Sequence, residues 1–147
     1  DAELAAIHQA ALSHVTTTQQ ALRAALAKLP VNATQQEVAA AVNEVYDKAA
    51  RHAAQLAATE AHRAAEAGKL AAWQATGAAQ WGVWRVRSAN PCGHCLALHG
   101  RRMPLGEAFF RKGDVSQDAA GKVLKLDYAD VQTPPLHVHC LCVLEAE

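Results

Sequence analysis

Cysteine placement is the feature that most constrains this chain. All four cysteines lie in two tight pairs, Cys92 with Cys95 and Cys140 with Cys142, and the second pair closely follows His137. A C-x-x-C loop directs two thiolates at one tetrahedral ion, and extended backbone places Cys140 and Cys142 on the same side of the chain. We therefore predict a structural zinc ion in the last third of the chain. Five candidate ligands compete for four positions, so either both terminal thiolates bind, or His137 and one of them bind while the other caps the site.

A bound metal would also compensate for a shortage of core material. Apolar residues make up 51% of the chain, but many of them are alanine and aromatic residues make up only 5%. Structural zinc contributes roughly 10 to 16 kcal/mol to the folding of small domains. Two disulfides, or one long-range disulfide with two free thiols, would also use four cysteines, but the sequence lacks a secretory signal pattern. A redox C-x-x-C normally opens a helix in a βαβ unit, whereas this one follows Asn90-Pro91 and is expected to lead into a hairpin.

Charge and hydropathy give no support for a nucleic-acid or membrane partner. The 14 basic residues balance the 14 acidic residues, so net charge gives no argument for a nucleic-acid coat or an anionic membrane. Four arginines of the second half of the chain, Arg85, Arg87, Arg101 and Arg102, are interpreted as a solvated face. No run of eighteen apolar residues occurs, so we expect a soluble protein without a membrane span. A first residue of Asp is unusual for a native start, so whether the sequence is a fragment of a longer protein stays open.

The predicted fold class is α+β, with Ala-rich N-terminal helices in residues 1–72 and a small zinc-bound β-rich module in residues 73–147. Apolar spacings of three, four and seven predict a first helix that Pro30 and Asn32 stop. Thr34 and Glu37 form a capping-box pattern that begins a second helix, with a break at Gly68. The first stripe comprises Leu4, Ile7, Ala11, Val15, Leu22, Leu26 and Leu29; the second comprises Val38, Val42, Val45, Ala49, His52 and Leu56, and continues through Thr59 and Arg63 towards Leu70.

Elements of the module are short. Residues 81–87 alternate in pattern and predict a strand, with Trp81 and Trp84 on opposite faces. We expect a hairpin arm over residues 96–103, a short helix around residues 107–111 followed by a polar loop, and a weak strand over residues 123–126. Pro134-Pro135 predicts an extended approach to the terminal ligands. His94 is expected to face solvent, His99 to be a turn residue, and the tryptophans to pack beside the metal.

Two enzyme classes that use zinc, a nucleobase deaminase and a nuclease, are alternatives to a structural role. The run Pro91-Cys92-Gly93-His94-Cys95 is similar to half of a zinc-dependent deaminase motif, but the required H-x-E element is missing. A zinc-supported nuclease, in which His137 and His139 activate water, needs an open coordination position. A shell filled by cysteine and histidine leaves none, so we predict that the protein is not an enzyme.

The residues together resemble a known family. Thr59-Glu60, Trp81 with Trp84, the C-x-x-C pair, Gly100 and the terminal P-P-x-H-x-x-C-x-C resemble the phage Mu F-like minor head proteins, also called head morphogenesis proteins, over residues 59–147. His99 stands where the family pattern has Asp, and Val138 and Leu141 stand where Pro and Arg are usual. The candidate metal ligands are unaffected by these departures.

The resemblance implies a structural protein inside the head of a tailed phage or prophage, present in the host cytoplasm during assembly. It implies association with the portal protein and other head proteins, oligomer formation, and a role in head morphogenesis, DNA packaging or ejection with contact to packaged DNA. The helical segment would then contact the portal or neighbouring copies. The same resemblance also allows an interaction module linked to a toxin domain.

Overall fold

The computed structural model describes the backbone from Ala2 to Glu147, and the side chains from His8 onward except that of Ala10. The fold class is α+β, as predicted, and the chain divides into two compact units, Asp1–Ala57 and Ala58–Glu147. The change of composition near residue 73 predicts a boundary at that position. The structure divides the chain earlier, inside a helix, because the last turns of that helix supply Glu66 and Leu70 to the buried part of the second unit.

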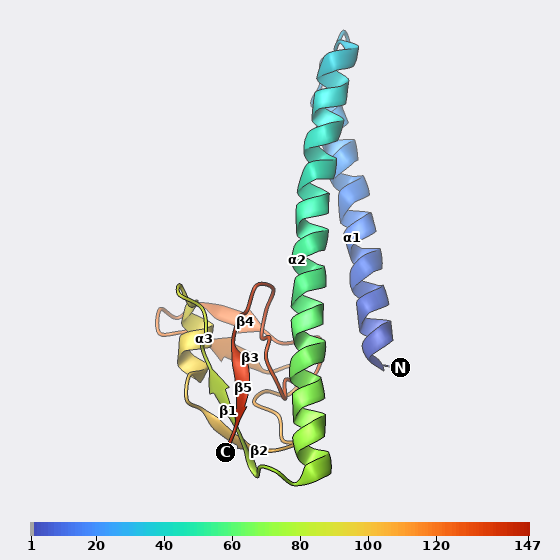
Figure 1. Ribbon diagram of the computed structural model, residues 1–147. Coiled ribbons are helices and arrows are strands. Elements are labelled where there is room, and N and C mark those ends of the chain that lie inside the picture. Colours follow the sequence, from blue (N-terminus) through green and yellow to red (C-terminus); the bar gives the residue numbers. More distant parts are fainter. Residues whose placement is uncertain (1) are drawn as a thin grey trace. The chain divides into compact units, whose positions relative to one another are not determined.

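Two helices form the first unit, α1 (Ala2–Ala27) and the first part of α2 (Gln35–Thr76) (Figure 1). The predicted capping box is present. The hydroxyl and the backbone N–H of Thr34 both donate to the Glu37 carboxylate, at 2.8 and 2.7 Å, and the Glu37 N–H donates to the Thr34 hydroxyl at 3.3 Å. These bonds satisfy amides that have no partner within the helix, so α2 begins where the sequence predicts.

The seam between these two helices is only half-buried. Among the described side chains of residues 8–57, none is fully buried. The partly covered row of α1 runs through His14, Thr18, Leu22 and Ala25 and continues to Leu29 just beyond the helix, whereas Val15, predicted on the stripe, is 53% exposed. Leu26 and Ala11 are also exposed, and the side chains of Leu4 and Ile7 lie outside the described residues. On α2 the partly covered residues include Val42, Val45, Ala49 and Leu56, as predicted, whereas Val38 and His52 are exposed.

Helix α2 does not break at Gly68. It continues to Thr76, and a Cβ at Gly68 would meet no atom within 4 Å. The helix ends instead at Gly77, whose φ of 64° is the left-handed conformation that glycine adopts after a helix at low cost. A single glycine costs about 1 kcal/mol in a helix interior, which contacts made by the neighbouring turns can offset.

The second unit contains a three-stranded antiparallel sheet in the order β2-β1-β5. Strand β1 (Trp81–Arg85) lies in the centre, between β2 (Arg102–Pro104) and β5 (Val143–Ala146). The register pairs Trp84 with Leu144, which fixes the end of the terminal ligand segment against the centre of the sheet. A separate hairpin joins β3 (Val115–Gln117) to β4 (Val123–Lys125).

Two predicted elements are wrong. The segment after Cys92 is helix α3 (Gly93–Leu98) rather than a hairpin arm, and only β2, beyond the turn at Gly100, pairs as a strand. Residues 107–111 form no helix; Phe110 instead makes an isolated antiparallel bridge to Val131. Both errors have the same cause, since short segments carry too few residues to show a period, and tertiary contacts decide their conformation.

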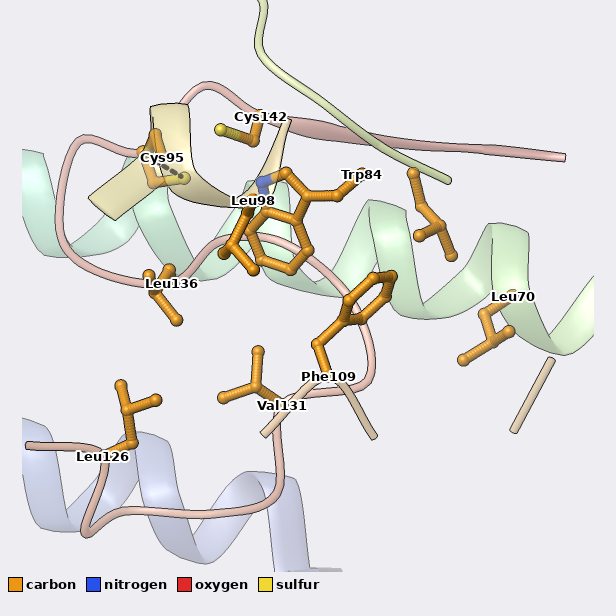
Figure 2. Packing of buried hydrophobic residues seen from close by; sticks show 11 residues of the cluster. Leu70, Trp84, Cys95, Leu98, Phe109, Leu126, Val131, Leu136 and Cys142 are labelled. Atoms are coloured by element: carbon orange, nitrogen blue, oxygen red, sulfur yellow. Dashed lines mark hydrogen bonds between the residues drawn. The ribbon is translucent and has the colours of Figure 1, made fainter. Parts of the chain in front are cut away.

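The core of the second unit surrounds Trp84, which is 0% exposed (Figure 2). Its ring packs edge-to-face on Phe109, with centroids 5.2 Å apart and an interplanar angle of 74°. Leu70 of α2 joins this cluster, as do Cys95, Cys140 and Cys142. The apolar core and the cysteine cluster are therefore continuous.

Polar side chains of α2 also hold β5 through its backbone. The Glu66 carboxylate, 3% exposed, accepts a 2.8 Å hydrogen bond from the Leu144 N–H and lies 2.7 Å from the Lys69 ammonium. Lys69 in turn donates to the Leu144 carbonyl at 3.3 Å. The edge of β5 is thereby satisfied by a helix, which protects it from pairing with another chain.

We expect Glu66→Ala to lower the free energy of unfolding of the second unit by about 1 to 3 kcal/mol, because it leaves the buried Leu144 N–H without an acceptor. Urea unfolding followed by tryptophan fluorescence measures this change. The matched control is Glu60→Ala on the same helix, which removes only a 3.1 Å ion pair to Arg63 with both side chains 30% exposed and should cost less than about 1 kcal/mol. Equal losses for the two variants would contradict the role of Glu66.

Candidate metal centre

The first two candidate ligands are placed by the start of α3. Cys92 is its N-cap residue, and its sulfur accepts a 3.5 Å hydrogen bond from the Cys95 N–H. One turn of helix thus brings both sulfurs to the same side. Gly93 between them is required by a close approach, because a Cβ there would lie 2.5 Å from an Asp118 carboxylate oxygen. The C-x-x-C loop therefore opens a helix, contrary to the prediction of a hairpin, but in an antiparallel sheet rather than a βαβ unit.

The remaining candidates lie on a tight turn that leads into β5. The Cys140 N–H donates to the His137 carbonyl at 3.1 Å, and His139 takes a positive φ of 64°. Helix α2 anchors this turn at both ends: Thr59 accepts from the His139 N–H at 3.3 Å, and His62 donates to the Cys142 carbonyl at 2.7 Å. The segment after His137 is therefore a turn rather than the predicted extended chain, and both Cys140 and Cys142 are buried.

All five candidate ligands come together. Two overlapping groups have donor atoms within 4.8 Å of one another, Cys92 with Cys95 and His137, and Cys95 with Cys140 and Cys142. The His137 Nε2 atom lies 3.0 Å from the Cys92 sulfur and 3.3 Å from the Cys95 sulfur, and the Cys95 and Cys140 sulfurs are 3.7 Å apart. Ligands of a tetrahedral zinc are separated by about 3.8 Å for two sulfurs and about 3.6 Å for sulfur and nitrogen. The arrangement can hold a metal ion, and Cys95 belongs to both groups.

The orientation of His137 suits coordination through Nε2. Its Nδ1–H donates to the Val138 carbonyl at 2.8 Å, which leaves the Nε2 lone pair directed at the Cys92 and Cys95 sulfurs. Burial alone would lower the pKa of His137, but the Val138 carbonyl and the charges of Cys140 and Cys92 together raise it. A metal ion at Nε2 would compete with a proton for this lone pair.

Neighbouring thiols of the cluster shift one another's pKa values in opposite directions, because nearby positive charge is too small to stabilise several thiolates at once. Hydrogen bonds from Cys142 and Cys95 lower the pKa of Cys140, whereas the Cys140 thiolate raises the pKa of Cys95 and raises that of Cys142 to about 11. At the rim, burial raises the pKa of Cys92, but the Cys95 N–H and His137 outweigh it, so the net shift is downward. A divalent cation would allow the sulfurs to ionise together, since it supplies the missing charge. All four cysteines are free thiols, and the disulfide alternatives are not formed.

Trp84 connects this cluster to the core. Its buried indole N–H has no regular hydrogen-bond partner among the described residues, and it lies close enough to Cys142 to oppose the rise in the pKa of that thiol. Figure 2 shows the indole nitrogen on the side of the ring that faces Cys95 and Cys142. Trp84 therefore packs beside the cluster as predicted, whereas Trp81 is partly exposed.

Three other histidines have structural positions. His94 is 6% exposed and bonds Ser116 at 3.1 Å, so the prediction that it faces solvent is wrong. The sequence carried no sign of this contact, because Ser116 lies on a strand that was predicted as loop. His99 accepts a hydrogen bond from the Val86 N–H and caps the end of α3, in agreement with a turn role. His139 is exposed.

Of the four arginines predicted as a solvated face, Arg87, Arg101 and Arg102 are exposed and Arg85 is half-buried, and all four also make contacts within the chain. Arg85 and Arg87 both pair with Glu145, and Arg102 pairs with Glu147 at 2.9 Å while it lies over the ring of Trp81. Arg101 stacks over Phe110. Three of the four arginines are paired with carboxylates, which weakens their attraction for phosphate.

Comparisons with protein-family models, with curated proteins and with solved structures gave no significant match to this chain. Within the described residues, no helix combines the length and the hydropathy needed to cross a membrane.

Because Cys95 belongs to both groups of ligands, we expect Cys95→Ser to lose the metal ion that the cysteine cluster retains through purification. Elemental analysis of the purified chain measures the bound metal. Ala97→Ser, an exposed position on the same helix, is the control and should retain the metal content of the unsubstituted chain. Metal retained in full by Cys95→Ser would show that the cluster is not the binding site.

Proposed function

We propose that the metal is one structural zinc ion bound by Cys92, Cys95, His137 and Cys140. Three short distances link the donor atoms of these residues in series: Cys92 to His137, His137 to Cys95, and Cys95 to Cys140. Soft thiolates and imidazole in tetrahedral geometry select zinc over magnesium and calcium. Cys142 is the thiol that caps this shell, because it interacts with the Trp84 indole N–H and is absent from this series of short distances.

A zinc shell of this kind is structural rather than catalytic. Its four positions are filled by protein atoms, so no position is open for a water molecule. The ion joins α3 to the turn before β5 and thereby closes a long loop of the second unit. On this proposal the protein is not an enzyme, and the energy of zinc binding supports folding.

Single substitutions separate the proposed shell from its alternatives. We expect Cys92→Ser and His137→Ala to lose zinc, because each removes a ligand, and Cys142→Ser to retain one zinc per chain with lower stability. Elemental analysis and thermal unfolding of each variant measure the two properties. If Cys142→Ser lost its zinc and Cys92→Ser retained it, the fourth ligand would be Cys142 and not Cys92.

We further propose that the chain is a structural minor head protein of a tailed phage or prophage, which associates with the portal and acts in head morphogenesis, DNA packaging or ejection. The observation that supports this proposal is the convergence of the motif residues. Thr59 contacts the His139 backbone, Trp84 packs beside Cys142, and the two cysteine pairs meet at Cys95. Residues that resemble the phage Mu F-like family in sequence thus serve one site rather than being scattered over the surface.

In this role the two units would have different functions, metal-stabilised folding in the second and protein contact in the first. The second unit is a module with its own core and metal site, whereas the first exposes apolar side chains such as Leu12 and Val15, at 52% and 53%. Exposed apolar faces on helices are typical of surfaces that bind another protein. We therefore propose that the helical unit contacts the portal or a neighbouring head protein.

Co-expression with the portal protein encoded by the same phage or prophage tests this assignment. We expect the chain to co-purify with the portal, and the double variant Leu12→Asp, Val15→Asp to lose the association while it keeps its zinc, because the charges would be buried at the contact. Gln19→Asp and Gln20→Asp, exposed on the same helix, form the matched control and should still associate. Absence of the unsubstituted chain from both portal complexes and purified particles would contradict the virion role.

A further inference from the structure

The first unit carries a second pair of metal-ligand side chains that the zinc proposal does not use. His14 of α1 and His52 of α2 face each other across the helix seam, with their Nδ1 atoms 3.2 Å apart. Their rings meet edge-on, with centroids 5.0 Å apart and an interplanar angle of 66°. Nitrogens bound to one tetrahedral zinc at 2.0 to 2.1 Å are separated by about 3.3 Å. Both nitrogens are therefore at the separation that a shared metal ion requires.

The surroundings of the pair leave room for further ligands. A groove of about 300 Å³ lies beside the two rings and is lined by Thr17, Thr18, Glu44 and Lys48, among others. The Thr18 hydroxyl donates to the His14 carbonyl at 2.9 Å, which leaves its oxygen free to accept from a metal-bound water. The Glu44 carboxylate supplies a negative charge on the same side, and the Lys48 ammonium opposes it.

We propose that His14 and His52 form a second, solvent-accessible site for a divalent transition-metal ion, which joins α1 to α2. Imidazole is a preferred ligand of Zn²⁺, Ni²⁺ and Cu²⁺, and water molecules in the groove complete the coordination. The ion cross-links two helices whose described side chains are never fully buried, so its effect on the stability of the pair is large relative to their packing. The site differs from the cysteine cluster in position, ligand type and openness.

Zn²⁺ titration of the full chain in the Cys95→Ser background isolates this site from the cluster. Calorimetry is expected to show one saturable equivalent of Zn²⁺, with a rise in the melting temperature of the helical signal at 222 nm. His14→Ala and His52→Ala should each lose both effects, while His8→Ala, an exposed histidine of α1, should keep them. Lys48→Gln should tighten binding several-fold, because it removes the opposing charge.

Two results would overturn the proposal. One is identical Zn²⁺ binding by the background chain and its His52→Ala variant. The other is a loss in His8→Ala as large as that in His52→Ala, which would indicate nonspecific binding to surface histidines. All of these histidines are exposed or half-buried, so the variants are expected to fold and their metal binding can be compared directly.

Discussion

The second unit depends on the meeting of sulfur and nitrogen donors from two distant segments around Cys95. Buried thiols in contact cannot all lose their protons, since each new thiolate raises the pKa of its neighbours, as Cys140 does for Cys95 and Cys142. A cation removes this conflict and converts mutual repulsion into attraction to a common centre. The geometry of α3 and of the turn before β5 makes structural sense when the cluster is treated as a metal site, because apolar packing alone would not require five such groups together.

The rest of the second unit holds these donors in position. Helix α2 supplies a row of polar side chains, Thr59, His62, Glu66 and Lys69, that bond the backbone from His139 to Leu144. Bonds to backbone groups fix the path of a segment independently of its side chains, so the donor atoms of those side chains can point towards a common centre. The pairing of Trp84 with Leu144 also holds the end of this segment against the sheet. The ligand turn is thus constrained on both sides before any ion binds.

The sequence allowed prediction of the parts that local chemistry decides. The capping box at Thr34, the strand at Trp81 and the grouping of the ligands all follow from residue type and spacing. It did not allow prediction of α3, where six residues are too few to show a helical period, or of the burial of His94, whose partner Ser116 lies on a strand with no detectable pattern. The role of Glu66 was also missed, because a glutamate on a long helix is normally exposed and only the position of β5 makes it buried.

The two units illustrate different sources of stability. The second unit has a closed core around Trp84 and a ligand cluster continuous with it. The first is a helix of 26 residues against the start of one of 42 residues, held by good local helix formation but by no fully buried side chain among those described. Helices in water gain most of their stability from packing an apolar face, so a pair this open gains from any partner that covers it or any ligand that joins it. The exposed apolar residues of the first unit offer a surface that a partner could cover, and the facing histidine pair offers a site where a ligand could join the helices. Either would add stability that the packing of the two helices lacks.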